Sequence, residues 1–104
     1  MKNEKETFSE FLNRKQIELR NSQIESLKKR WPNLSDYEIE CVYNKSIFIG
    51  MSRDGLIASF GNPEDINTSV GPWGKHEQFV YPGKKDYENI YVYVENGFIT
   101  SWQD

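Results

Sequence analysis

Cys41 and His76 are the residues of this 104-residue chain whose types could support nucleophilic catalysis, and each type occurs once. A Cys–His pair needs both side chains in contact, and the wide separation of the two residues along the chain gives no support for that. No group beside Cys41 in the sequence would activate its thiol, so we expect a small buried side chain. A single cysteine also excludes a disulfide within the chain.

His76 and Glu77 adjoin each other in "KHEQ", a segment typical of a strand. Neighbouring side chains of a strand point to opposite faces, so this pair should not converge on a metal ion or a proton. Other acidic pairs, such as Glu64–Asp65, stand at exposed positions where a solvated surface is the simpler interpretation. The alternative is an enzyme that uses acidic groups near His76 for proton transfer.

A glycine-rich loop that cradles phosphate is also missing, because "GPWG" is not followed by a helix. The sequence therefore predicts no catalytic residue, no metal site and no cofactor, and we interpret the chain as a non-enzyme. The first residues, "MKNEKETFSEFLNRK", lack the apolar stretch of a signal peptide, and no transmembrane segment follows. They predict a cytoplasmic protein, or an envelope protein whose leader has been removed.

The charges are unevenly distributed along the chain. Residues 1–31 contain eight Lys/Arg against five Asp/Glu, giving +3, whereas residues 32–104 contain five against eleven, giving −6. A basic helix joined to an acidic domain is either an interaction device or a solvated surface of mixed charge. The acidic balance of the larger part would repel phosphate, so a nucleic-acid partner is not expected.

The N-terminal residues 1–31 predict one long amphipathic helix. Thr7 and Glu10 have the spacing of a capping box, Ile17, Ile24 and Trp31 recur every seven residues, and Pro32 ends the pattern. Ile17, Ile24, Leu27 and Trp31 form an apolar seam along this helix. The seam either docks on the rest of the chain or associates with a second copy or a partner. Residues 32–104 are expected to form a compact α+β part, with one domain overall.

Two shorter helices are expected next. Ser35 and Glu38 form a second capping-box pattern, which predicts a helix from Asp36 to Asn44. Ser52 is a good N-cap for a third helix, and Gly61 can take the left-handed conformation that ends it before Pro63. The stretch "IGMSRDGLIASFGNPEDIN" is therefore interpreted as a corner of the fold and not as a catalytic loop.

Four strands complete the pattern, at residues 66–70, 76–81, 89–94 and 98–102, with short connections such as the "ENG" hairpin signal. They predict an α+β fold in which the N-terminal helices pack on a four-stranded antiparallel meander sheet. Alternation assigns Ile90, Val92, Val94 and Ile99 to one face. The opposite face, with a loop residue beside it, supplies the candidate partner-binding residues Tyr91, Tyr93, Phe98, Trp102 and Trp73.

Exposed Tyr and Trp clusters favour interfaces. The alternative is that the first helix covers this aromatic face, or that its rings stack as cross-strand pairs. RNA-binding platforms also carry aromatic side chains on a sheet, but the acidic surroundings argue against that function.

The segments "IGMSRDGLIASFGNPEDIN", "EQFVYP" and "IYVYVENGFITSWQ" together resemble the SmpA/OmlA group of small bacterial domains. This group includes BamE-like lipoproteins and the repeat of β-lactamase inhibitory protein. The resemblance covers roughly residues 47–103; the long first helix and a lipidated cysteine are not part of the match. It implies helices packed on a three- or four-stranded antiparallel sheet, in a family whose members bind other proteins and are not known as enzymes.

The sequence therefore predicts a non-catalytic protein-binding module that acts through its aromatic sheet face. By analogy with the inhibitory relative, it would block a partner protein by occupying its surface. The alternative is a structural or assembly protein that forms a homodimer through the N-terminal helix.

Overall fold

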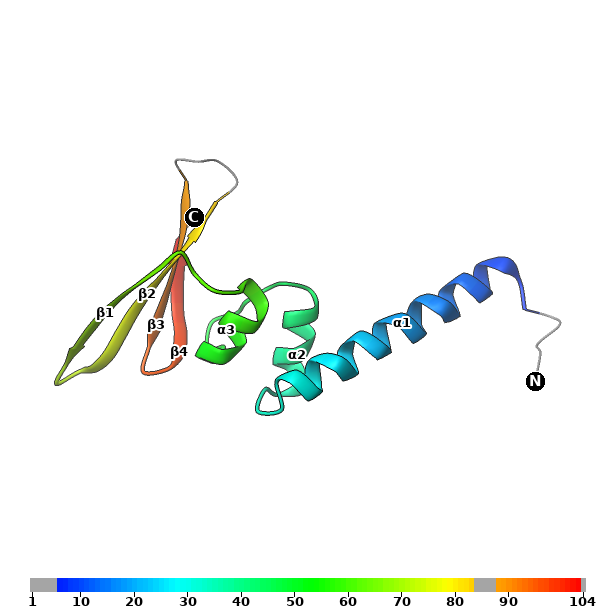
Figure 1. Cartoon of the computed structure of the whole chain (residues 1–104), viewed down its shortest axis with the longest axis horizontal. Coiled ribbons are helices and arrows are strands. Elements are labelled where there is room, and N and C mark those ends of the chain that lie inside the picture. Colours follow the sequence, from blue (N-terminus) through cyan, green and yellow to red (C-terminus); the bar gives the residue numbers. More distant parts are fainter. Residues whose placement is uncertain (1–5, 84–87, 104) are drawn as a thin grey trace. The chain divides into compact units, whose positions relative to one another are not determined.

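The computed structural model describes residues 6–83 and 88–103. The chain forms two compact units, residues 1–32 and 33–104. Three helices precede a four-stranded antiparallel sheet, which confirms the predicted α+β class (Figure 1). The elements are α1 (Phe8–Arg30), α2 (Asp36–Tyr43), α3 (Arg53–Phe60), β1 (Asp65–Gly71), β2 (Gly74–Pro82), β3 (Asn89–Glu95) and β4 (Phe98–Gln103).

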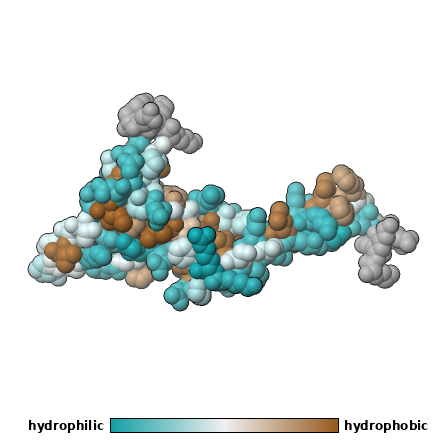
Figure 2. All heavy atoms as spheres, in the orientation of Figure 1, coloured by the Kyte–Doolittle hydropathy of each residue, from teal (hydrophilic) through white to brown (hydrophobic). Residues whose placement is uncertain are grey.

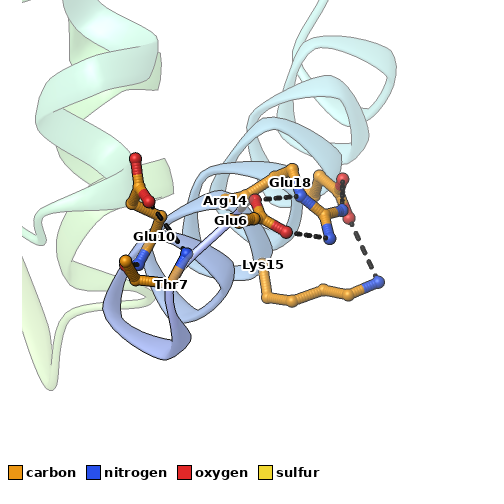
Figure 3. A network of polar contacts seen from close by, with 6 residues as sticks. All are labelled: Glu6, Thr7, Glu10, Arg14, Lys15 and Glu18. Atoms are coloured by element: carbon orange, nitrogen blue, oxygen red, sulfur yellow. Dashed lines mark hydrogen bonds and ion pairs between the residues drawn. The ribbon is translucent and has the colours of Figure 1, made fainter. Parts of the chain in front are cut away.

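Helix α1 begins with the predicted capping box, in which Glu10 N donates to Thr7 Oγ1 and Thr7 N donates to Glu10 Oε1. Arg14 binds the carboxylates of Glu6 and Glu18 along the exposed helix surface (Figure 3). None of residues 8–30 is buried. Figure 2 shows apolar side chains at the N-terminal end of α1. The exposed apolar residues of this end are Phe8, Phe11 and Leu12.

The carboxylate of Glu38 joins the starts of α2 and α3. Its Oε1 accepts a hydrogen bond from Ser35 N at 3.2 Å and completes the predicted capping box of α2. Its Oε2 accepts from both Ser52 N at 2.9 Å and Ser52 Oγ at 2.6 Å, at the N-cap of α3. The two helices lie so close that a Cβ at Gly55 would be 2.9 Å from Glu38 Oε2. One side chain thus holds two helix termini together.

The hydrogen bonds at Glu38 also change its acidity. Burial raises the pKa of this carboxyl, but the side-chain and backbone bonds from Ser52 and Ser35 outweigh burial and lower it below the usual 4.5. Bonds to the charged form stabilise that form. The folded protein therefore holds Glu38 as a carboxylate.

The sheet has the sequential order β1-β2-β3-β4 predicted for a meander. The β1–β2 hairpin turns at Pro72–Trp73, with Gly71 opposite Gly74. The β3–β4 hairpin turns at Asn96–Gly97, both with positive φ, as the Asn-Gly signal predicts.

Helices α2 and α3 lie on one face of this sheet. The rings of Phe60 in α3 and Tyr81 in β2 meet edge to face at 5.4 Å, and Arg53 of α3 binds Glu77 of β2. The apolar side chains of α2 and α3 form a single core with this face of the sheet. The buried core residues include Ile39, Val42, Met51, Leu56, Phe79, Val92, Val94 and Ile99.

The segment from Gly50 to Arg53 turns the corner predicted from the sequence and also bonds to β4. Gly50 N donates to Ile99 O at 2.7 Å, Ile99 N donates to Met51 O at 2.8 Å, and Arg53 N donates to Gly97 O at 2.9 Å. Gly50 and the cap residue Gly61 have φ values of 95° and 85°, which favour glycine. The corner therefore also covers the first part of an edge strand.

A β-bulge in β4 changes the face of its last residues. Val94 lies opposite Ile99 and Tyr93 lies opposite Ser101, so Thr100 is an extra residue without a cross-strand partner. Beyond it, Trp102 lies opposite Val92 and shares the face covered by the helices. The predicted placement of Trp102 on the aromatic face is therefore wrong, because strict alternation takes no account of an inserted residue.

Candidate protein-binding face of the sheet

The face of the sheet that points away from α2 and α3 is called the open face below. The register assigns residues to it, because residues directly opposite each other in a sheet share a face. Its members are Asp65, Asn67, Ser69, His76, Gln78, Val80, Tyr91, Tyr93, Glu95, Phe98, Ser101 and Gln103. Three of the five predicted binding residues, Tyr91, Tyr93 and Phe98, therefore stand on one surface.

A row of hydrogen bonds crosses the open face through all four strands. Asn67 Nδ2 of β1 donates to Gln78 Oε1 of β2 at 2.8 Å, and Gln78 Nε2 donates to Tyr93 OH of β3 at 3.3 Å. Tyr93 OH then donates to Gln103 Oε1 of β4 at 3.0 Å. The row restricts the rotamers of its side chains. Lost side-chain freedom is one of the costs of association, and this arrangement reduces it.

A second group of contacts lies beside this row, nearer the hairpin turns. His76 Nε2 is 3.3 Å from Glu95 Oε1, and Thr100 Oγ1 donates to Glu95 Oε2 at 2.9 Å. The Trp73 ring lies 5.9 Å from the His76 ring. A Cβ at Gly71 would overlap the Trp73 ring, so glycine there leaves room for it. Trp73 therefore extends the open face, as predicted.

The aromatic side chains of this surface differ in exposure. Phe98 is 55% exposed and Trp73 is 54% exposed, whereas Tyr91 and Tyr93 are half-buried. Trp102 is 41% exposed but belongs to the opposite face, so it cannot join them in one contact. The sequence did not identify Asn67, Gln78 and Gln103, because their alignment depends on a register that local patterns do not specify.

Glu77, the neighbour of His76 in the sequence, lies on the helix-covered face. The two side chains are therefore on opposite faces of the sheet, as predicted. Only 3% of the Glu77 side chain is exposed, and Arg53 Nε and Nη2 bind its two carboxylate oxygens at 2.9 and 3.0 Å. Lys75 Nζ is 3.8 Å from Oε2. These bonds raise the pKa of Arg53, since the hydrogen bond to Glu77 outweighs desolvation. Glu77 is thus the buried member of an ion pair with the partly exposed Arg53, and it is held apart from His76.

A pocket of about 450 Å³ lies beside Tyr81, where α3 ends against the sheet. Burial raises the pKa of Tyr81 to about 12, and its hydroxyl donates to Gly61 O at 3.0 Å. The Tyr81 hydroxyl therefore stays protonated and donates a hydrogen bond at the C-terminal end of α3. The pocket is lined by Lys45, Ser59, Phe60, Asn62, Tyr81, Pro82 and Ile90.

Cys41 is buried in α2, as expected for a packed thiol. Within residues 6–83 and 88–103, no three His, Cys, Asp or Glu side chains gather as a set that could hold a metal ion. No helix in that part of the chain is long and apolar enough to cross a membrane.

Comparison of the chain with family models, curated proteins and solved structures finds no match.

Proposed function

We propose that this chain is a non-catalytic protein-binding module and that its open face contacts another protein. The observation that carries the proposal is the combination of aromatic rings with a pre-ordered polar row on one side of the sheet. Tyr, Trp and Phe are enriched in protein interfaces, and Phe98 and Trp73 keep about half of their surface available to a partner. Tyr93 contributes to both features, because its ring belongs to the open face of β3 and its hydroxyl belongs to the row.

The negative charge of the open face and of residues 32–104 indicates which class of partner the module would bind. Asp65 and Glu95 lie on the open face, and residues 32–104 carry a net charge of −6. Such a surface attracts a partner with a basic patch and repels phosphate backbones. The resemblance of residues 47–103 to SmpA/OmlA-like domains supports the same class of function. An inhibitor that occupies the surface of a basic partner fits both arguments.

The double variant Tyr91→Ala/Phe98→Ala is expected to lose a bound partner while the fold and the polar row remain. Truncation of one hot-spot ring costs about 2 kcal/mol, which is roughly a thirtyfold loss of affinity, so we expect at least that loss from the double variant. The measurement is affinity capture from lysate of the source cells, with retained proteins identified by mass spectrometry and the affinity of the purified pair then determined by calorimetry.

Trp102→Ala is the matched control for that double variant, because it removes an exposed ring from the opposite face of the same sheet. It should capture the partner as the wild type does. Equal capture by the wild type and the double variant, with both folded, would contradict the assignment to the open face.

The second candidate is a structural protein that forms a homodimer through α1. The specific observation is that α1 has no buried residue although Ile17, Ile24 and Trp31 recur at seven-residue intervals. A stable isolated helix of this kind needs an apolar partner surface. A dimer that Ile24→Asp dissociates, with helical content retained, would establish this candidate. A dimer that survives the substitution would exclude it.

A further inference from the structure

Strand β1 forms one edge of the sheet, and no strand lies beyond it among the described residues (Figure 1). Its seven residues pair with β2 without a register shift. Natural edge strands are usually protected by lysine, proline, a bulge or a covering segment. The other edge has two of these devices, the bulge at Thr100 and the corner at Gly50–Arg53. The sequence of β1, "DINTSVG", has no lysine and no proline.

The pairing of β2 shows which backbone groups of β1 point outward. Asn96 N donates to Lys75 O at 2.8 Å, and this bond flanks the opposed residues His76 and Glu95. A bond in that position marks His76–Glu95 as a non-hydrogen-bonded pair of β2 and β3. Bonded and non-bonded pairs alternate along an antiparallel ladder. His76 and every second residue of β2 therefore direct their backbone groups toward β1.

The residues of β1 opposite that set are Asp65, Asn67 and Ser69. Their N–H and C=O groups bond to β2, so the groups of the residues between them face away from the sheet. These outward-facing residues are Ile66, Thr68 and Val70. All three lie on the helix-covered side of the sheet by register, and all three are β-branched, which suits pairing in a strand.

The outward-facing set is self-complementary about Thr68. When a second copy approaches antiparallel with a two-fold axis at this residue, Thr68 meets Thr68 of the second copy. Ile66 then meets Val70 of the second copy, and Asp65 meets its Gly71, so no like charges oppose each other. Val70 is 72% exposed, and this contact would cover it with an apolar neighbour. Cross-strand β-branched pairs and three bonded pairs would support the contact.

We propose that two copies of this chain pair antiparallel along β1, with the two-fold axis at Thr68. The two sheets become one continuous sheet, and both open faces lie on the same side of it. This inference goes beyond the proposed function, because it assigns a second copy to a different surface and gives the binding module two contact areas.

Disulfide trapping tests the register directly. In a Cys41→Ser background, Thr68→Cys is expected to form a cross-linked dimer under mild oxidation, because opposed Cα atoms in a bonded pair are about 5.5 Å apart, within disulfide range. The control Val70→Cys should not cross-link, because its two sulfurs would be offset by four residues along the strands, about 13 Å. Equal cross-linking of both variants, or none of Thr68→Cys, would overturn the proposed register.

Light scattering of the full chain tests whether the dimer forms through β1. The wild type should show twice the 12.3 kDa mass of one chain, and Thr68→Lys should show the single mass, because two ammonium groups would oppose each other. The backbone groups of Thr68 do not bond to β2, so this variant should keep the circular dichroism spectrum of the wild type. Ile24→Asp in α1 should keep the double mass. A monomeric wild type, or a dimer dissociated by Ile24→Asp alone, overturns the proposal.

Discussion

Replacing Glu38 with alanine is expected to lower the free energy of unfolding by about 2 kcal/mol. The substitution removes the acceptor for Ser35 N at the start of α2 and for Ser52 N and Oγ at the start of α3. Bonds to a charged group are stronger than neutral ones, but Glu38 is half-buried and water screens part of the effect. Urea unfolding followed by circular dichroism measures the change.

Glu10→Ala is the matched control, because Glu10 closes the capping box of α1 without reaching a second helix. We expect it to leave the unfolding of the sheet unit unchanged. Ser52→Ala should be destabilising by itself, and its loss should not add fully to that of Glu38→Ala, since the two residues share one bond. Full additivity, or equal losses from Glu38→Ala and Glu10→Ala, would contradict the shared-cap interpretation.

The lowered pKa of Glu38 predicts that the free energy of unfolding depends on pH. The pKa of Glu38 is lower in the folded protein than its usual value of 4.5, so its contribution is fully present above that pH. It is lost as the pH falls through the lowered folded pKa. Unfolding midpoints at a series of pH values should therefore decline more in the wild type than in Glu38→Gln below pH 4.5. Parallel curves for the two proteins would argue against this linkage.

Replacing Arg53 with methionine is expected to cost about 2 kcal/mol of stability, below the range for a fully buried ion pair because the Arg53 side chain is 36% exposed. The change leaves the carboxylate of Glu77, with 3% of its side chain exposed, without its bidentate partner. Lys75 at 3.8 Å retains part of the compensation. Methionine keeps an unbranched chain near the Phe79 ring, over which the guanidinium lies at 5.1 Å.

The double variant Arg53→Met/Glu77→Leu should recover most of that loss, because an apolar pair of similar volume often replaces a buried ion pair without cost. The exposed counterpart is Arg14→Met, which breaks contacts with Glu6 and Glu18 on the surface of α1. It should not shift the urea midpoint measurably. A double variant as unstable as Arg53→Met alone would show that the loss comes from packing and not from an unpaired charge.

The helices and the hairpins could be predicted because their signals are local. The capping boxes at Thr7 and Ser35 and the positive φ at Asn96–Gly97 each depend on a few adjacent residues. The meander follows from short connections, since strands joined by tight turns pair with their neighbours.

The polar contacts of the open face could not be predicted in the same way. The Asn67–Gln78 bond spans β1 and β2, and the bond from Tyr93 to Gln103 spans β3 and β4, so both depend on register. The second role of Glu38 depends on a residue fourteen positions away that is brought close by the corner. Alternation identified Tyr91 and Phe98 correctly and misplaced Trp102, since the insertion at Thr100 has no residue signature of its own.

The bulge at Thr100 determines what the last residues of β4 display on each side of the sheet. Residues before it, such as Phe98, keep their side whatever happens at position 100, whereas Ser101, Trp102 and Gln103 take theirs from the extra residue. Deletion of Thr100 would remove the bulge and leave Ser101, Trp102 and Gln103 opposite the partners they have now. Regular pairing that kept Thr100 would instead place Trp102 opposite Tyr91, on the open face. Whether Thr100 is paired or bulged thus decides whether the indole or the terminal glutamine of β4 belongs to the contact surface, with no side chain replaced.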